Sequence, residues 1–280
     1  PHVADLERAV LFQHNVETVL WRRRAQHAAD PLAKAYLKLQ ADRMFRYERS
    51  ACRKAGSIVA VSAEDARTMK ELFGVERVHE IPTGVDVGYF APHGQCEPVA
   101  DLVFCGSMDW PPNIDGVGYF LNSILPRIRQ QRPQTTVAIV GRDPSDKIRA
   151  AAGQAGGVLV TGTVPDVRPY LWGAKVAVVP IRMGGGTRLK IYESMAARVP
   201  VVSTRVGAEG LGVSHPENIR LADDPDLFAE QCLSLLESEG ARARIAEAAW
   251  RAVSMQFTSE QVARRFEEAL ATAPDAAPTR

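Results

Sequence analysis

Short apolar runs alternate with helical patterns along almost the whole chain, and this alternation limits the possible fold more than any other feature. The runs are continuous in their apolar character, which is typical of parallel strands covered on both faces. Short links between strands and helices predict doubly wound α/β units with parallel sheets. We expect strands at residues 9–13, 57–61, 78–81, 102–105, 136–140, 158–161, 176–180, 199–203 and 218–221, and helices at 31–54, 64–73, 114–130, 187–197, 224–238 and 240–255.

The regular alternation is interrupted between residues 82 and 100, where proline and glycine are frequent. Such a stretch is typical of a link between domains, and a length of 280 residues allows two of them. We predict a partial N-terminal domain at residues 1–92, which holds too few strands to be complete, and a complete domain at residues 93–256. The tail, residues 271–280, is rich in proline and alanine and is expected to be disordered.

Composition and charge exclude several classes of protein. The hydrophobic fraction is 46% and the charged fraction 24%, as in globular domains. A net charge of +1 is too small for a general nucleic-acid-binding protein, so no nucleic-acid partner is expected. The four cysteines are scattered, which argues against a zinc site or a disulfide framework and fits a reducing compartment. No apolar segment is long enough to span a membrane, and we expect a cytoplasmic location.

Charge is unevenly distributed although it nearly cancels overall. Residues 20–54 contain ten Lys or Arg residues and three acidic residues. A solvated helical face would explain this, and so would attraction to an anionic membrane surface or to a phosphate-bearing acceptor. The aromatic residues Trp21, Phe45 and Tyr47 lie among these charges and favour the second explanation slightly.

Residues 184–193 are the most informative segment for chemistry. Three glycines follow a predicted buried strand and allow the backbone to approach a ligand closely. The free N–H groups and the dipole at the start of the next helix favour an anion such as phosphate. Arg188 and Lys190 at the start of this helix oppose its dipole unless an anion is bound. The carboxylate of Glu193, one turn later, can bind two ribose hydroxyls. A tight turn with packing glycines is the alternative. The candidate residues are Gly184, Gly185, Gly186, Thr187, Arg188, Lys190 and Glu193.

Together with other landmarks, this segment resembles the GT-B glycosyltransferases of family four, the glycosyl transferases group 1 type. The likeness is greatest to bacterial exopolysaccharide-type sugar transferases and extends from Leu11 to about Leu270. Its landmarks occur in order at residues 12–17, 58–62, 81–86, 104–108, 162–167, 184–193 and 200–207.

The resemblance implies two Rossmann-like domains of the GT-B type with the active site in the cleft between them. The C-terminal domain would bind a nucleotide-diphosphate sugar of the UDP or GDP type. The N-terminal domain would bind a glycan or a lipid-linked acceptor, with peripheral contact at the inner membrane face as a further possibility. Residues 257–270 would form a helix that crosses back to the N-terminal domain. Such enzymes transfer the sugar with retention of configuration and need neither a metal nor another cofactor.

Individual roles follow from matching positions. Glu193 matches the second glutamate of the E-x7-E motif, which holds the ribose. Arg188 and Lys190 would neutralise the diphosphate, and His14 matches a histidine on the acceptor side of the cleft. We therefore identify His14, Arg188 and Lys190 as candidate catalytic residues. The turn at residues 207–210 would line the nucleotide pocket.

The sequence also departs from the family pattern. Gly185 stands where the first glutamate of the motif is expected, and the loop at residues 106–110 lacks the usual basic residues. The resemblance begins midway through the N-terminal domain, so we expect a truncated chain. A non-catalytic nucleotide-sugar-binding fragment is the alternative function, and an epimerase or phosphorylase on the same fold is a weaker one. Asp224 and Asp226 form a D-x-D pattern, which helix capping explains better than a metal site.

Overall fold

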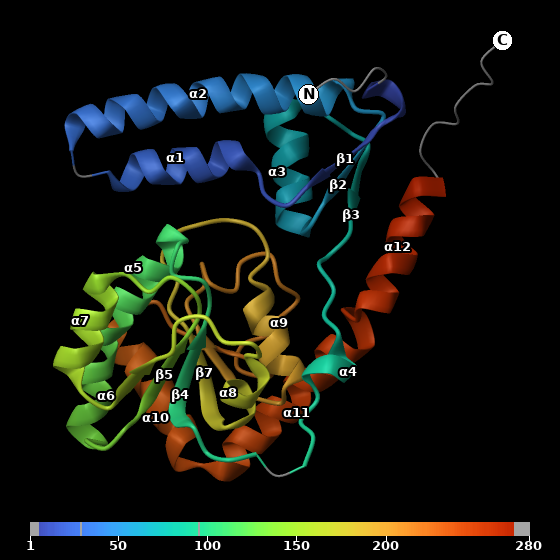
Figure 1. Cartoon of the computed structure of the whole chain (residues 1–280). Helices are drawn as coiled ribbons and strands as arrows, with labels where there is room; N and C mark the ends of the chain where they lie inside the picture. Colours follow the sequence, from blue (N-terminus) through green and yellow to red (C-terminus); the bar gives the residue numbers. More distant parts are fainter. Residues whose placement is uncertain (1–5, 29, 95, 272–280) are drawn as a thin grey trace.

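The computed structural model describes residues 6–28, 30–94 and 96–271, so the predicted disorder of the tail from residue 272 on lies outside the described residues. Two parallel sheets organise the chain (Figure 1). Every strand pair within them is parallel, which confirms the predicted α/β class. The first sheet has the order β1-β2-β3 and the second the order β6-β5-β4-β7-β8-β9. The strands are β1 (Val10–Gln13), β2 (Ser57–Ala60), β3 (Val78–Glu80), β4 (Ala100–Cys105), β5 (Val137–Val140), β6 (Val158–Val160), β7 (Ala174–Val179), β8 (Val201–Ser203) and β9 (Arg220–Leu221).

Helices cover the faces of both sheets, and the main core lies around the second one. The helix predicted at residues 114–130 is instead two α-helices joined by a π-helical segment, Phe120–Ile124. A short 3₁₀ turn, Leu6–Arg8, precedes the first strand. The α-helices are α1 (Glu17–His27), α2 (Pro31–Lys54), α3 (Ala63–Phe73), α4 (Val87–Phe90), α5 (Pro111–Tyr119), α6 (Leu125–Gln131), α7 (Asp146–Ala155), α8 (Arg168–Trp172), α9 (Leu189–Ala196), α10 (Pro225–Glu237), α11 (Glu239–Gln256) and α12 (Ser259–Ala271).

Helix α1 is absent from the sequence-based prediction, and its first turn depends on a residue far along the chain. Val16, which precedes α1, offers no side-chain cap. Glu48 of α2 supplies the cap instead: one carboxylate oxygen accepts from the Glu17 N–H at 2.8 Å and the other from the Thr18 N–H at 2.7 Å. The Thr18 hydroxyl also donates to Glu48. Because free N–H groups at a helix start need acceptors, α1 forms as part of a hairpin with α2.

Two chain crossings connect the halves of the molecule. The first crossing runs from β3 to β4, and the second leads from α11 into α12. They touch where Val85 and Thr258 form an isolated parallel bridge. Beyond this bridge α12 packs on the first sheet, with Ala269, Phe266 and Val262 against Val59 and neighbouring residues. The last helix therefore lies on the sheet of the N-terminal half, far in sequence from the strands it covers (Figure 1).

Candidate functional site

The carboxyl ends of both sheets face the space between the two halves of the molecule, which we call the gap (Figure 1). In the second sheet the adjacent strands β4, β7 and β8 end there, and β7 leads into the triglycine loop, Gly184 to Gly186. In the first sheet His14 and Asn15 follow β1, and a carbon added at Gly186 would lie 2.8 Å from the His14 carbonyl oxygen. Ligands of doubly wound folds bind at the carboxyl ends of the strands. The triglycine loop therefore lies where residues of both halves can contact one ligand.

The triglycine loop has a backbone that only glycine adopts without strain at two of its positions. Gly184 has a φ of 123° and Gly186 a φ of 75°. The Asn15 side chain occupies the space where a carbon on Gly186 would lie, and Leu20 of α1 does the same at Gly185. The glycine at residue 185, where the family motif places a glutamate, thus leaves room for α1 to pack against the loop.

Arg188 directly precedes α9 and is almost completely buried, with 3% of its surface exposed. Its Nη1 donates to the Gly186 carbonyl. Its Nε and Nη2 have no hydrogen-bond partner among the described residues, and the same is true of the hydroxyl of Thr187. Burial lowers the pKa of Arg188 to about 10, so the guanidinium stays charged at neutral pH. A buried cation with two unused donors is costly unless a ligand supplies acceptors.

Lys190 lies in the first turn of α9 and points toward the loop after β4. Its Nζ donates to Asn113 Oδ1 at 2.8 Å and lies 4.2 Å from the centre of the Phe104 ring. Burial lowers the pKa of this amine to about 8. Glu193 follows one turn later, and burial raises the pKa of its carboxyl while the Lys190 charge lowers it. Lys190 and Glu193 thus form one group on the side of β4.

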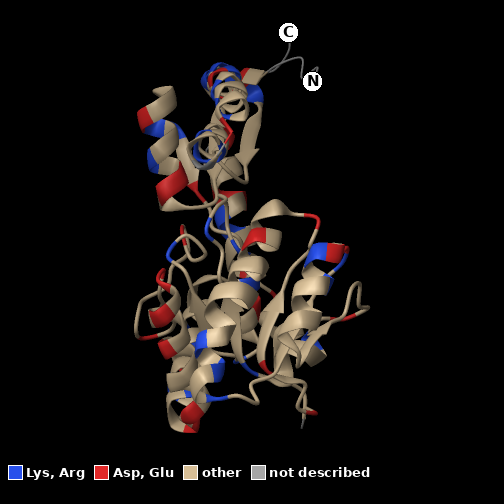
Figure 2. Cartoon of the chain, turned by 90° about the vertical axis from the view of Figure 1, so that its left-hand side faces the viewer, with Lys and Arg blue, Asp and Glu red and all other residues tan. Residues whose placement is uncertain are grey.

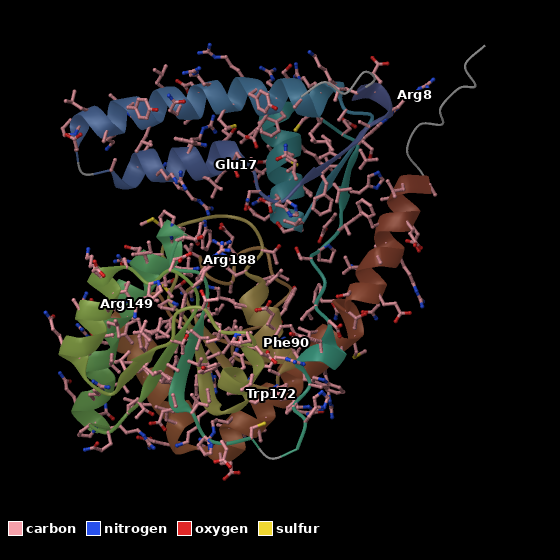
Figure 3. All side chains as sticks on the ribbon, in the orientation of Figure 1. Arg8, Glu17, Phe90, Arg149, Trp172 and Arg188 are labelled. Carbon is pink, nitrogen blue, oxygen red and sulfur yellow. The ribbon has the colours of Figure 1, made fainter. Side chains whose placement is uncertain are left out.

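The two predicted cations have different surroundings. Arg188 interacts electrostatically with Glu209, Arg23 and Asp65, all on the side of the gap, whereas Lys190 interacts most strongly with Cys105 and Glu193. Figure 3 shows Arg188 between the lower half and the helices α1 and α3. The start of α9 therefore presents positive charge in two directions.

A cavity of about 100 Å³ lies in the gap beside Arg188. Arg23 of α1 spans the gap next to it: Nη1 donates to the Gly184 carbonyl at 2.7 Å, and the guanidinium binds both carboxylate oxygens of Glu209 at 2.6 Å. Gly210, in the loop after β8, lies against Ser62 at the start of α3. The cavity is lined by Val16, Val19, Leu20, Arg23, Ser62, Glu64, Asp65, Thr68, Gly185, Gly186, Arg188, Glu209 and Gly210.

His14 reaches the triglycine loop through its backbone. Its ring is exposed and packs edge-on against Phe12, with ring centres 4.7 Å apart. Of the turn at residues 207–210, Gly210 lines the cavity of the gap, whereas Gly207 is enclosed by Ser203, Thr204 and the Val179 carbonyl. Of the predicted residues, Gly185, Gly186, Arg188 and Gly210 line the cavity of the gap, whereas His14, Lys190 and Glu193 do not.

Sequence reasoning missed Arg23 and Asn113, and it included Glu209 only as part of the turn at residues 207–210. Arg23 stands in a run of three arginines, and nothing in that run distinguishes it from its neighbours. Asn113 lies in α5 and its amide donates to the Ser107 carbonyl at 2.7 Å, which fixes it beside Lys190. In the sequence alone, an asparagine in a helix does not indicate a functional residue. Only the fold shows that Asn113 lies beside Lys190.

The D-x-D pattern is part of a helix start. The Asp224 side chain accepts from the N–H groups of Asp226 and Leu227 at 2.9 and 3.2 Å, as a helix cap does. The Asp226 carboxylate pairs with Arg127. Within residues 6–271, as far as they are described, no group of three or more His, Cys, Asp or Glu side chains is placed to hold a metal ion. No described helix has the length and apolar character needed to cross a bilayer.

Comparisons with known proteins point to one family. Residues 100–238 match the model of the glycosyl transferases group 1, and residues 9–89 match that of Glycosyltransferase Family 4. A protein of the cps region of Klebsiella pneumoniae is 25% identical over 58% of this chain and 44% of its own length. A phosphatidyl-myo-inositol mannosyltransferase of Mycolicibacterium smegmatis is 30% identical over 71% of this chain and 55% of its own length. The chain thus spans about half the length of these curated relatives.

The fold has counterparts among solved structures. Anabaena Alr3699/HepE, determined in complex with UDP and glucose, superposes with a TM-score of 0.73 over 94% of this chain and 71% of its own, at 16% identity. That likeness establishes the fold: two Rossmann-like halves of the GT-B type. With both segments matched in order, the chain belongs to the group 1 and family 4 glycosyltransferases.

Proposed function

We propose that this chain is the donor-binding part of a glycosyltransferase that moves a sugar from a nucleotide-diphosphate sugar to a glycan or lipid-linked acceptor. The main support is the set of buried polar atoms at the start of α9. The Thr187 hydroxyl and two nitrogens of Arg188 are buried without a hydrogen-bond partner among the described residues. Buried polar atoms are rarely left unpaired, so these donors are suited to phosphate oxygens.

The chemistry of the leaving group fits these residues. When the glycosidic bond breaks, the diphosphate gains negative charge. The helix N–H groups, Lys190 and Arg188 are fixed in place and stabilise that charge more in the transition state than in the ground state. Glu193 is placed one turn further along α9, where its carboxylate would accept from the ribose hydroxyls. Because these groups supply positive charge, we propose transfer without a metal or another cofactor.

The acceptor would enter from the N-terminal half, past His14. The name of the mycobacterial relative describes transfer to a phosphatidyl-inositol lipid, and the Klebsiella relative is encoded in a cps region. We propose a lipid-linked or glycan acceptor in surface or exopolysaccharide synthesis, a cytoplasmic location, and retention of configuration. Product analysis by nuclear magnetic resonance with the whole protein tests the last point, and an inverted anomeric signal would contradict it.

Calorimetric titration of the 280-residue chain with UDP and GDP tests the donor site. We expect one of them to bind, and the tests below that name UDP use whichever of the two binds. Arg188→Ala and Glu193→Ala should each weaken that binding at least tenfold. Arg264→Ala is the matched control, because Arg264 is exposed and pairs with Glu260 on α12. Absence of binding by a folded chain, or equal binding by all variants, would contradict the assignment.

A second candidate is a non-catalytic nucleotide-sugar-binding unit. It is favoured by Gly185 in place of the first motif glutamate. The two functions are distinguished by incubating the whole protein with UDP-sugars and candidate acceptors. Binding with neither hydrolysis nor transfer would favour the binding unit.

The outer face of α2 supports a proposed contact with an anionic membrane. Leu32, Tyr36 and Leu39 are 81%, 60% and 53% exposed on successive turns of this helix. Arg43 and Arg46 are also exposed, and Figure 2 shows basic residues on the helices of this end of the molecule. Exposed apolar and aromatic residues beside cations are typical of helices that lie in a bilayer interface.

Sedimentation with vesicles tests the membrane proposal. We expect binding to vesicles that contain phosphatidylglycerol and weak binding to phosphatidylcholine alone. The double variant Arg43→Glu/Arg46→Glu should bind the anionic vesicles at least tenfold more weakly, because each basic residue near the surface contributes about 1 kcal/mol. Equal binding by the variant would contradict this role of α2.

Nucleotide binding should depend on pH through Lys190. The pKa of this amine is about 8 in the free protein, and an anion would bind its protonated form. Above this pKa the affinity for UDP should fall by nearly tenfold per pH unit, until the higher pKa of the complex is reached. Titrations from pH 7.5 to 9.5 measure this. Lys190→Arg should show a flat profile, since the guanidinium keeps its charge; an equally steep profile would assign the titration to another group.

A further inference from the structure

Two arginines, Arg23 and Arg188, lie near the carboxylate of Glu209. The two guanidinium groups and Glu209 line the same cavity. Arg23 binds both carboxylate oxygens of Glu209 at 2.6 Å, whereas Arg188 has two unpaired buried nitrogens. Glu209 is also the neighbouring charge that acts most strongly on Arg188. The Glu209 carboxylate could therefore pair with either arginine, and it is paired with Arg23 of α1.

Pairing with Arg23 affects the availability of Arg188. A carboxylate that lost its partner beside a buried cation would gain by binding it, since paired charges are strongly favoured over unpaired ones at low dielectric. Arg188 would then use its spare donors on Glu209, and a phosphate arriving there would compete with a bound carboxylate. Arg23 prevents this exchange by holding both oxygens of Glu209 in a bidentate pair.

The rest of the Arg23 contacts fix it in this role. Nη1 donates to the Gly184 carbonyl at 2.7 Å as well as to Glu209, so the side chain is held at a defined position beside the triglycine loop. Its neighbour Arg24 differs: it is exposed and lies over the Trp21 ring, 5.5 Å from its centre. The local arginine run thus contains one residue that reaches the other half of the molecule and one that stays on α1.

We propose that Arg23 is a positioning residue, which keeps Glu209 away from Arg188 so that the Arg188 donors remain available to the diphosphate of the donor substrate. This inference rests on the proposed function. It makes a prediction that an ordinary structural ion pair does not make. Removing Arg23 should weaken nucleotide binding only while Glu209 keeps its charge.

The test is UDP affinity in four proteins: the unmodified chain, Arg23→Gln, Glu209→Gln and the double variant. We expect Arg23→Gln to weaken UDP binding at least tenfold. Glu209→Gln and the double variant should bind within about threefold of the unmodified chain. Arg24→Gln is the matched control and should bind as the unmodified chain does.

Thermal unfolding of the same proteins separates positioning from structure. The ion pair across the gap is lost in all three Arg23 and Glu209 variants, so all three unfolding midpoints should fall. Arg23→Gln and the double variant also lose the Nη1 bond to the Gly184 carbonyl, so their midpoints should fall further than that of Glu209→Gln. Recovery of UDP affinity in the double variant without recovery of the midpoint would support the proposal. If the double variant binds as weakly as Arg23→Gln, or if Glu209→Gln alone is as weak, the proposal is wrong.

Failure of the proposed function would look different. If the unmodified chain binds no nucleotide, or if Arg188→Ala leaves the affinity unchanged, the donor site itself is wrongly assigned. If both of these behave as expected and only the rescue fails, the role of Arg23 alone is refuted.

Discussion

Lys190→Met is expected to reduce UDP affinity on the order of 100-fold and to raise the free energy of unfolding of the ligand-free chain by about 1–2 kcal/mol at pH 7. The two effects share one cause. Burial lowers the pKa of Lys190 to about 8, so a protonated amine in poorly hydrated surroundings destabilises the ligand-free protein. Methionine has a similar length and removes that cost, but it also removes the charge that would bind the diphosphate.

Denaturant unfolding at several pH values measures the stability effect. The folded pKa of Lys190 is about 8 and its ordinary value is 10.5, so the unfolded chain binds more protons between these values. The stability of the unmodified chain should therefore rise with pH across this window, and the advantage of Lys190→Met should shrink. A methionine variant that is less stable at pH 7, or that binds UDP normally, would refute the assignment.

Glu48→Ala should lower the free energy of unfolding by about 3 kcal/mol. Glu48 is 3% exposed and accepts from the backbone N–H groups of Glu17 and Thr18 and from the Thr18 hydroxyl. Alanine leaves these donors at the start of α1 without an acceptor. Because α1 carries Arg23, the loss should extend to the contacts with the second half of the molecule.

Hydrogen exchange of the α1 amides, together with denaturant unfolding, checks this result. Glu48→Gln keeps one carbonyl oxygen and should lose only part of the stability. Glu64→Ala is the surface control, because Glu64 pairs with the exposed Arg67 on α3 and should contribute less than about 1 kcal/mol. If Glu48→Ala unfolds within 1 kcal/mol of the unmodified chain, the cap is not what stabilises α1.

The sequence predicted those parts of the fold that depend on local pattern. All strands of both sheets were expected within a few residues of where they lie, because continuous β-branched runs are typical of buried parallel strands. The start of α9 was expected near residue 187 for a similarly local reason: three glycines after a strand allow little else.

Features that depend on distant residues could not be predicted in this way. Helix α1 needs Glu48, which is about thirty residues further along the chain. The π-helical segment at Phe120–Ile124 is followed by Pro126 in the first turn of α6, but a proline in a helical pattern indicates a kink or a helix end and does not specify a π-helical segment. The separation of Arg188 from Lys190 was also hidden, because spacing along a helix start does not show that one side chain will lie against α1 and the other against Asn113.

The bridge between Val85 and Thr258 has a mechanical consequence. The two segments that connect the halves lie side by side at this bridge. Gly84 contributes to this, because a side chain there would collide with Ser259. The bridge lies near α4 and α12, whereas α1, which carries Arg23, lies on the other side of the molecule (Figure 1). The two halves are thus held together at two separate places, by the bridge where the chain crosses and by the ion pair of Arg23 with Glu209 across the gap, and separating them at the gap requires breaking this ion pair.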